Sequence, residues 1–80
     1  QLSLQIMSYN QEVVDKVEAN MPAVRNSLIM LFSGQDYDVL NTAEGKENLR
    51  KEVLISVHDV LHLRGDLKVN NVYFTGFVMQ

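Results

Sequence analysis

The fold is decided by residues 42–65, TAEGKENLRKEVLISVHDVLHLRG, which carry the longest helical pattern of the chain. Thr42 is suited to cap a helix, and Glu44 adds negative charge to the first turn, where the helix dipole favours it. The apolar positions form an arc of roughly 140°, which is typical of a helix that packs on a core. These positions are Leu49, Val53, Leu54, Val57, Val60 and Leu61. The pattern predicts one long helix that ends near His62 to Gly65.

A second helical pattern precedes this segment and is interrupted by a proline. Asn10 can cap it, and one apolar stripe then runs through Val13, Val17, Met21, Val24, Leu28 and Leu31. Proline inside a helix removes a hydrogen bond and costs about 3 kcal/mol. We therefore expect either two helices that meet at Asn20–Met21 or one helix kinked there, with Pro22 at the first position of the second helix.

Beyond the proline the pattern makes two further predictions. Ile29 and Met30 lie off the apolar stripe, so we expect the second helix to be covered on more than one side. Gly34 should end it, and Asp36–Leu40 should form one short helical turn.

A strand is predicted at each end of the chain. Apolar and polar residues alternate over 2–7, whereas both faces of residues 72–79 are apolar, which predicts a strand that is central or covered on both sides. The expected fold is α+β, with a small antiparallel sheet packed against two to three helices. Two strands alone make a marginal sheet. We expect a strand from upstream, or from a neighbouring subunit, to complete it.

The chain of 80 residues is long enough for one domain and too short for two. It has no initiator methionine and opens inside a strand pattern, so we expect residues 1–80 to be a single domain of a longer protein, with any anchoring or targeting segment upstream. Seven basic residues are scattered among ten acidic ones, which leaves no basic stripe for nucleic acid or an anionic membrane. No apolar run approaches the ~20 residues of a membrane span.

Candidate catalytic and metal-binding groups are sparse. His58 and His62 are four residues apart on the long helix, a spacing that lets two imidazoles share a metal ion. A zinc-binding or small-ligand sensor is therefore one interpretation, and solvated or interface histidines are the favoured one, because no third ligand is evident. Asp36 and Asp38 resemble the start of a calcium loop, but Asn41 stands where that loop needs glycine. We predict no catalytic residue, no metal and no cofactor.

The apolar residues outside the predicted core suggest a surface that binds protein. Large exposed apolar patches usually mark interaction surfaces. The candidate interface residues are Ile55, His58, His62, Tyr73, Phe77 and Met79. The alternative for Ile55, Tyr73, Phe77 and Met79 is that these side chains are core residues placed wrongly.

Two stretches of the sequence, MPAVRNSLIMLFSGQDYDVLNTAEGKENLRKEVL and VYFTGFVMQ, resemble FliL, the flagellar basal-body-associated protein family. The cluster of Thr42, Glu44, Gly45 and Lys46 is the most specific part of the resemblance. The chain departs from the family at Ala43, where proline is common, and at Gly76, where a larger and often acidic residue is common. Gly76 weakens a strand interior and indicates a bulge.

The resemblance implies more than the residues alone. FliL proteins are bacterial inner-membrane proteins with one N-terminal span and a periplasmic C-terminal domain similar to the stomatin (SPFH) fold. They assemble as rings around stator units and support torque and swarming. The expected partners are other copies of the chain and stator membrane proteins. A stomatin-like membrane scaffold with another client is the alternative within this class.

Overall fold

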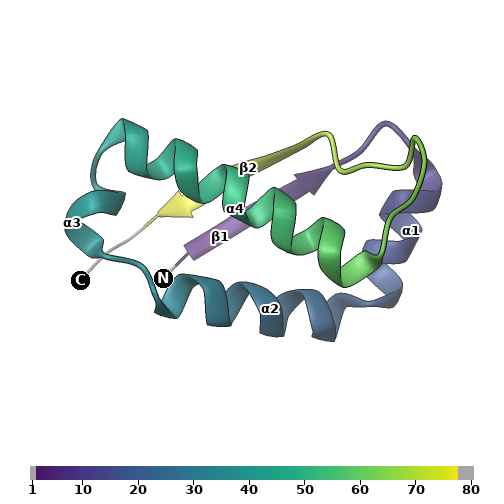
Figure 1. The fold of residues 1–80 in the computed structure, drawn as a ribbon, viewed down its shortest axis with the longest axis horizontal. Coiled ribbons are helices and arrows are strands. Elements are labelled where there is room, and N and C mark those ends of the chain that lie inside the picture. The colour runs from purple at the N-terminus through teal and green to yellow at the C-terminus, as the bar shows by residue number, and fades with distance from the viewer. Residues whose placement is uncertain (1, 78–80) are drawn as a thin grey trace.

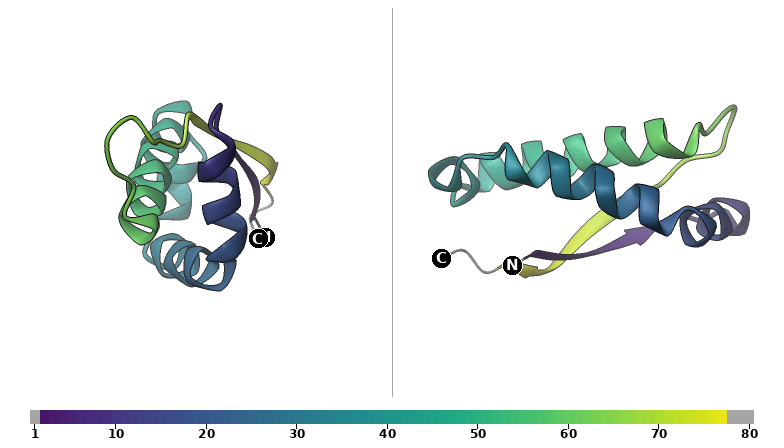
Figure 2. Two further views of the ribbon diagram at one scale, coloured as in Figure 1. Left: turned by 90° about the vertical axis from the view of Figure 1, so that its right-hand side faces the viewer. Right: turned by 90° about the horizontal axis from the view of Figure 1, so that it is seen from below.

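The computed structural model describes residues 2–77 and confirms the α+β class. The elements follow in the order β1 (Leu2–Met7), α1 (Gln11–Ala19), α2 (Met21–Ser33), α3 (Tyr37–Leu40), α4 (Ala43–Leu61) and β2 (Asn71–Phe77). Helices α2 and α4 lie on one side of a two-stranded antiparallel sheet, with α3 and α1 at opposite ends of the molecule (Figure 1). Two views at right angles show the sheet and the two long helices as separate layers (Figure 2).

The helix starts follow the predicted caps. The Asn10 side chain accepts a hydrogen bond from the Glu12 backbone N–H at 2.8 Å, and α1 begins after it. Pro22 marks a true break, since α1 ends at Ala19 and α2 begins at Met21 with the proline in its first turn. Pro22 is the second residue of α2, one position later than expected.

The short turn predicted after Gly34 is also present. Gly34 follows the last residue of α2, and the Asp36 side chain caps α3 by accepting a hydrogen bond from the Asp38 backbone N–H at 2.8 Å. Asp36 therefore serves as a helix cap.

The sheet contains a bulge at the position that the sequence indicated. Leu4 pairs with Phe74 and Ser3 pairs with Gly76, so Thr75 is an extra residue of β2. The prediction that β2 is central or covered on both faces is wrong for the part of the chain that the structure describes. There β2 pairs only with β1, and Tyr73 and Thr75 on its outer face are exposed.

The core lies between the sheet and the helices, and it contains most of the predicted stripe. Buried apolar side chains from the helices, the segment before β2 and β2 itself form one cluster: Val13, Val17, Val24, Leu28, Leu40, Leu49, Val53, Val57, Leu61, Val69 and Val72. The predicted positions Leu54 and Val60 are half-buried at its edge. Between α2 and α4, the hydroxyls of Ser27 and Ser56 share a hydrogen bond of 2.5 Å.

The second helix is less covered than its sequence suggested. Ile29 and Met30 are 65% and 68% exposed, so within the described residues α2 packs on one side only. The prediction was wrong because Ile29 lies at an open groove between α2 and β1, and Met30 is exposed beside it.

Candidate interaction surfaces

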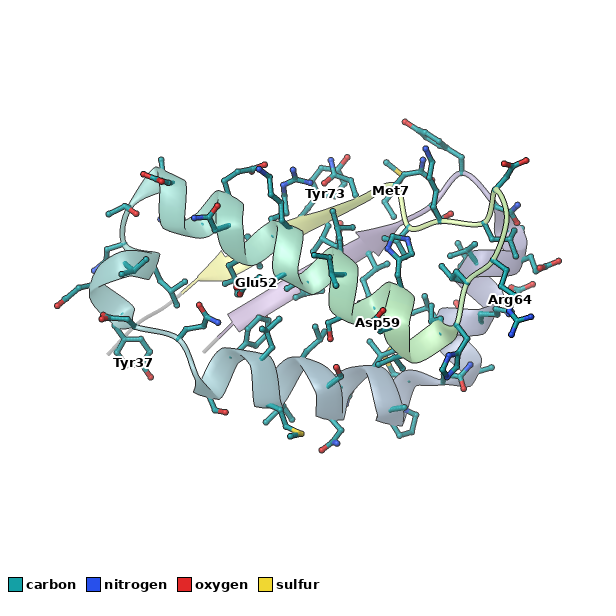
Figure 3. The ribbon with its side chains drawn as sticks, viewed as in Figure 1. Met7, Tyr37, Glu52, Asp59, Arg64 and Tyr73 are labelled. Carbon is teal, nitrogen blue, oxygen red and sulfur yellow. The ribbon has the colours of Figure 1, made fainter. Side chains whose placement is uncertain are left out.

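The outer face of α4 carries an isolated apolar side chain. Ile55 is 62% exposed and lies opposite the buried arc of the helix. Its neighbours on the same face, one turn before and after, are the charged residues Glu52 and Asp59, which Figure 3 labels along α4. His62 follows two turns after Ile55 and is exposed as well. We call Ile55 and His62 the outer α4 surface.

The two histidines have different surroundings. His58 is half-buried, and its Nε2 accepts a hydrogen bond of 2.9 Å from the backbone N–H of Val69, so it fixes the segment that leads into β2. His62 follows the last residue of α4 with a left-handed backbone, φ 51°. The lone pair that a metal would need at His58 Nε2 is thus engaged, which weakens the sensor interpretation. Within residues 2–77 no three histidine or acidic side chains are grouped as a metal site would require.

On the other side of α4, Arg50 forms an ion pair with Glu47 of the same helix and a hydrogen bond with Asn71 at the start of β2. Arg50 donates from Nε and Nη2 to the Glu47 carboxylate at 3.0 and 2.5 Å, and from Nη1 to Asn71 Oδ1 at 2.9 Å. The hydrogen bond from Arg50 holds the pKa of Glu47 below its ordinary value, and the same bond raises the pKa of Arg50. Sequence reasoning missed this network, because Asn71 is 21 residues from Arg50.

Tyr73 presents the second predicted surface, the outer face of the sheet. Its side chain is 47% exposed and lies opposite Gln5 of β1 (Figure 3). The register places the backbone of Phe77 opposite Leu2. The side chain of Phe77 and the whole of Met79 lie outside the described part of the chain, so their roles stay predictions.

The cluster most specific to the family resemblance, around Thr42 and Gly45, forms the close contact between α3 and α4. We call this contact the joint. The Thr42 hydroxyl accepts a hydrogen bond from the Gly45 N–H at 2.9 Å and donates one to the Val39 carbonyl at 2.7 Å. A Cβ atom added to Gly45 would lie 1.9 Å from that carbonyl oxygen. The family resemblance pointed to this cluster, and a glycine inside a predicted helix is a physical signal that could have found it, since glycine in a helix costs about 1 kcal/mol relative to alanine.

A groove of about 620 Å³ lies between β1, α1 and α2. Most of its lining is apolar, and the polar residues Ser3, Ser8, Glu18 and Arg25 complete it. The apolar residues are Leu4, Ile6, Val13, Val14, Val17, Met21, Val24, Leu28, Ile29 and Phe32. We call this feature the β1 groove. Ile29 is an outlier of the apolar stripe, but the sequence pattern alone does not place it opposite β1.

These features define a small α+β domain whose notable surfaces suit contact with other polypeptides. Comparison with known proteins identifies the family to which the domain belongs. The family model for the flagellar basal body-associated protein FliL matches residues 1–80, and the chain belongs to the FliL family.

Curated relatives lead to the same family. The chain is 35% identical over 79 residues to the flagellar protein FliL of Aquifex aeolicus, covering 99% of this chain and 47% of that protein. It is 40% identical over 62 residues to the flagellar protein FliL of Escherichia coli K12, covering 75% of this chain and 40% of that protein. The chain thus spans less than half of the length of these relatives. No helix in residues 2–77 is long and apolar enough to cross a bilayer.

Proposed function

We propose that this domain is a non-enzymatic accessory of the flagellar motor that associates with itself, as a ring, around stator units and thereby supports stator function, torque and swarming. In this proposal the domain lies at the periplasmic face of the inner membrane and is held there by an anchor upstream of residue 1. Membership of the flagellar basal body-associated family supports a role in the motor. The surfaces of the domain support a role in binding.

Ile55 is the observation that carries the proposal. Ile55 is 62% exposed between Glu52 and Asp59, so most of its apolar surface is left in water by the single chain. Covering it with a neighbouring subunit would remove most of its apolar surface from water, at about 25 cal/mol per Å². His62 extends the same surface with a polar group. Tyr73 lies on the outer face of β2, whereas Ile55 lies on α4, so each copy has two candidate surfaces on different elements.

Two different surfaces on one copy suit a head-to-tail arrangement. A contact of this kind joins unlike faces, and it closes into a ring when the rotation between copies permits. Anchoring in a membrane would raise the effective concentration of the copies, so weak contacts of modest area would suffice. The stator would then bind to the assembled ring.

The test compares Ile55→Asp with Met30→Asp in the membrane-anchored parent protein. Both side chains are about two-thirds exposed, at 62% and 68%, but only Ile55 belongs to the proposed interface. We expect Ile55→Asp to abolish assembly, measured by cross-linking in membranes, and to impair swarming, while thermal stability stays unchanged. Met30→Asp should leave all three properties intact. Phe77→Asp tests the final strand in the same way.

Several outcomes would count against the proposal. Normal assembly of both the Ile55→Asp and Phe77→Asp proteins would exclude these surfaces, and simple unfolding of Ile55→Asp would show that the residue serves the fold. Assembly without recovery of stator proteins would favour the stomatin-like scaffold with another client. Micromolar zinc binding that disappears in the His58→Ala, His62→Ala double variant would favour the sensor.

A further inference from the structure

Residues 62–70, which join α4 to β2, are held in place by hydrogen bonds near the end of the segment. The Val69 N–H donates to His58 Nε2 on α4 at 2.9 Å. The Ser8 hydroxyl donates to the Lys68 carbonyl at 2.7 Å. The bond to His58 therefore fastens the segment to α4, whereas the bond from Ser8 fastens it to the turn that follows β1.

The bond from Val69 requires a neutral histidine. An imidazole nitrogen accepts a hydrogen bond through the same lone pair that takes up a proton, so His58 Nε2 accepts only while the ring carries its single proton on Nδ1. A proton added at Nε2 makes this nitrogen a donor, and two donors then face each other. Because Val69 is only 3% exposed, its N–H reaches another acceptor only if the segment moves.

The surroundings of His58 offer a charged ring no bonded anion. Within residues 2–77 the ring forms no ion pair with a carboxylate. The titratable residues of the elements around it carry both signs, and β1 contributes none. They are Asp59 and His62 on α4, Arg64, Asp66 and Lys68 in the segment, Tyr73 on β2, and Glu12, Asp15, Lys16 and Glu18 on α1, which lies at the same end of the molecule (Figure 1). A proton on His58 thus breaks one hydrogen bond without completing an ion pair in this arrangement.

We propose that His58 is an acid-sensitive latch, which holds residues 62–70 against α4 while its ring is neutral and releases them when Nε2 takes up a proton from solvent. Histidine is the side chain that ordinarily changes charge between about pH 5 and pH 8. Since the bond needs the neutral ring, its contribution to stability is present at the upper end of this range and is lost as the pH falls.

Release of the latch affects the connection between two elements of the fold. Val69 and Val72 are both core residues, so the start of β2 loses its anchor on α4 when the segment moves. The outer α4 surface and Tyr73 lie on the two elements that the segment joins. The latch therefore controls how firmly these two surfaces are held in one arrangement, whether or not either of them binds a partner, and so it does not rest on the proposed function.

The test measures hydrogen exchange of the Val69 amide in the full-length parent protein at about pH 8 and about pH 5. Each rate is divided by that of an unstructured peptide at the same pH, which gives a protection factor. We expect the protection of Val69 to fall at least about tenfold in acid. The Lys46 amide, bonded to the Thr42 carbonyl at 3.1 Å near the other end of α4, should keep its protection.

Two variants separate a latch from a purely structural acceptor. His58→Gln supplies an amide oxygen that accepts at any pH in this range, so protection of Val69 should become independent of pH. His62→Gln is the matched control, because it removes the other histidine of α4 and leaves the bond to Val69 in place. The His62→Gln protein should show the same fall as the unsubstituted protein.

Constant protection of Val69 in the unsubstituted protein would overturn the proposal. An equal fall in the His58→Gln protein would show that acid acts elsewhere, and an equal fall at Lys46 would show unfolding of the whole domain; either result overturns it as well. If the His58→Gln protein fails to fold, the ¹⁵N resonances of the His58 ring in the unsubstituted protein decide. Protonation of the ring and loss of protection at Val69 must then share one midpoint, and a ring that titrates while Val69 stays protected overturns the latch.

Discussion

The two strands of the sheet are packed differently against the helices. We call the part at β2 and α4 the closed side, and the part at β1 and α2 the open side. On the closed side, α4 lies on β2, Arg50 and His58 tie the helix to the segment around the strand, and the joint with α3 leaves no room for a methyl group at Gly45. On the open side, β1 and α2 are separated by the β1 groove of about 620 Å³. The closed side is therefore tightly packed within residues 2–77, whereas the open side leaves a groove lined mostly by apolar side chains.

The largest effect should come from adding one methyl group to the joint. Gly45→Ala places Cβ 1.9 Å from the Val39 carbonyl oxygen, so α3 must move and the hydrogen bonds of Thr42 must break. We expect a loss of about 3 kcal/mol or more in the free energy of unfolding, at the upper end for overpacked sites. Chemical denaturation of the parent protein measures it.

Gly34→Ala is the matched control, because its Cβ would meet only the Leu31 carbonyl at 3.8 Å and its φ is −91°. It should be neutral or slightly stabilising. Equal losses for the two variants would show that the joint is not closely packed.

Removing the His58 side chain should have the next largest effect. His58→Ala leaves the N–H of Val69, a residue that is only 3% exposed, without its acceptor. An unsatisfied buried donor costs about 1–3 kcal/mol.

His62→Gly should act in the opposite direction and stabilise by about 1 kcal/mol or less, because glycine adopts the left-handed conformation of φ 51° without strain. Thermal unfolding of the two variants measures both effects. A His58→Ala protein as stable as the unsubstituted one would show that His58 does not stabilise the fold and would leave only a role in binding.

The features predicted from the sequence are those that depend on near neighbours. Asn10, Pro22 and Thr42 set helix boundaries through contacts within four residues, and the apolar period placed Leu49 and Val53 in the core. The period also identified Ile55 as an outlier, and the structure places it on the surface. Local signals of this kind need no knowledge of the fold.

The features that the sequence could not supply depend on distant partners. The hydrogen bond from Val69 to His58 spans 11 residues, and the position of Ile29 opposite β1 depends on the turn at Asn20. The same limit explains the error about β2, since two apolar faces indicate that a strand is covered without saying by what. If the cover is another subunit, a single chain must leave Tyr73 exposed.

The smallest expected effect on the free energy of unfolding comes from the ion pair between Glu47 and Arg50, and it depends on pH. Because Arg50 holds the pKa of Glu47 below its ordinary value of 4.5 in the folded chain, the pair stabilises the fold at pH values above 4.5. That contribution is lost as the pH falls through the lowered pKa, where the folded carboxylate takes up its proton. Glu47 is exposed, so solvent screens the pair and the effect is small.

Glu47→Gln should therefore flatten the loss of stability below pH 4.5 without changing the fold, as measured by unfolding from pH 7 down to pH 3. Arg50→Gln should remove the same dependence, because the shift needs both partners, but it should also cost stability at neutral pH through the lost bond to Asn71. High salt should reduce the difference between the unsubstituted protein and Glu47→Gln. An unchanged acid limb in the Glu47→Gln protein would show that the pair does not contribute to stability in solution, and the contact of α4 with β2 would then depend on the Arg50–Asn71 bond, on apolar packing and on His58.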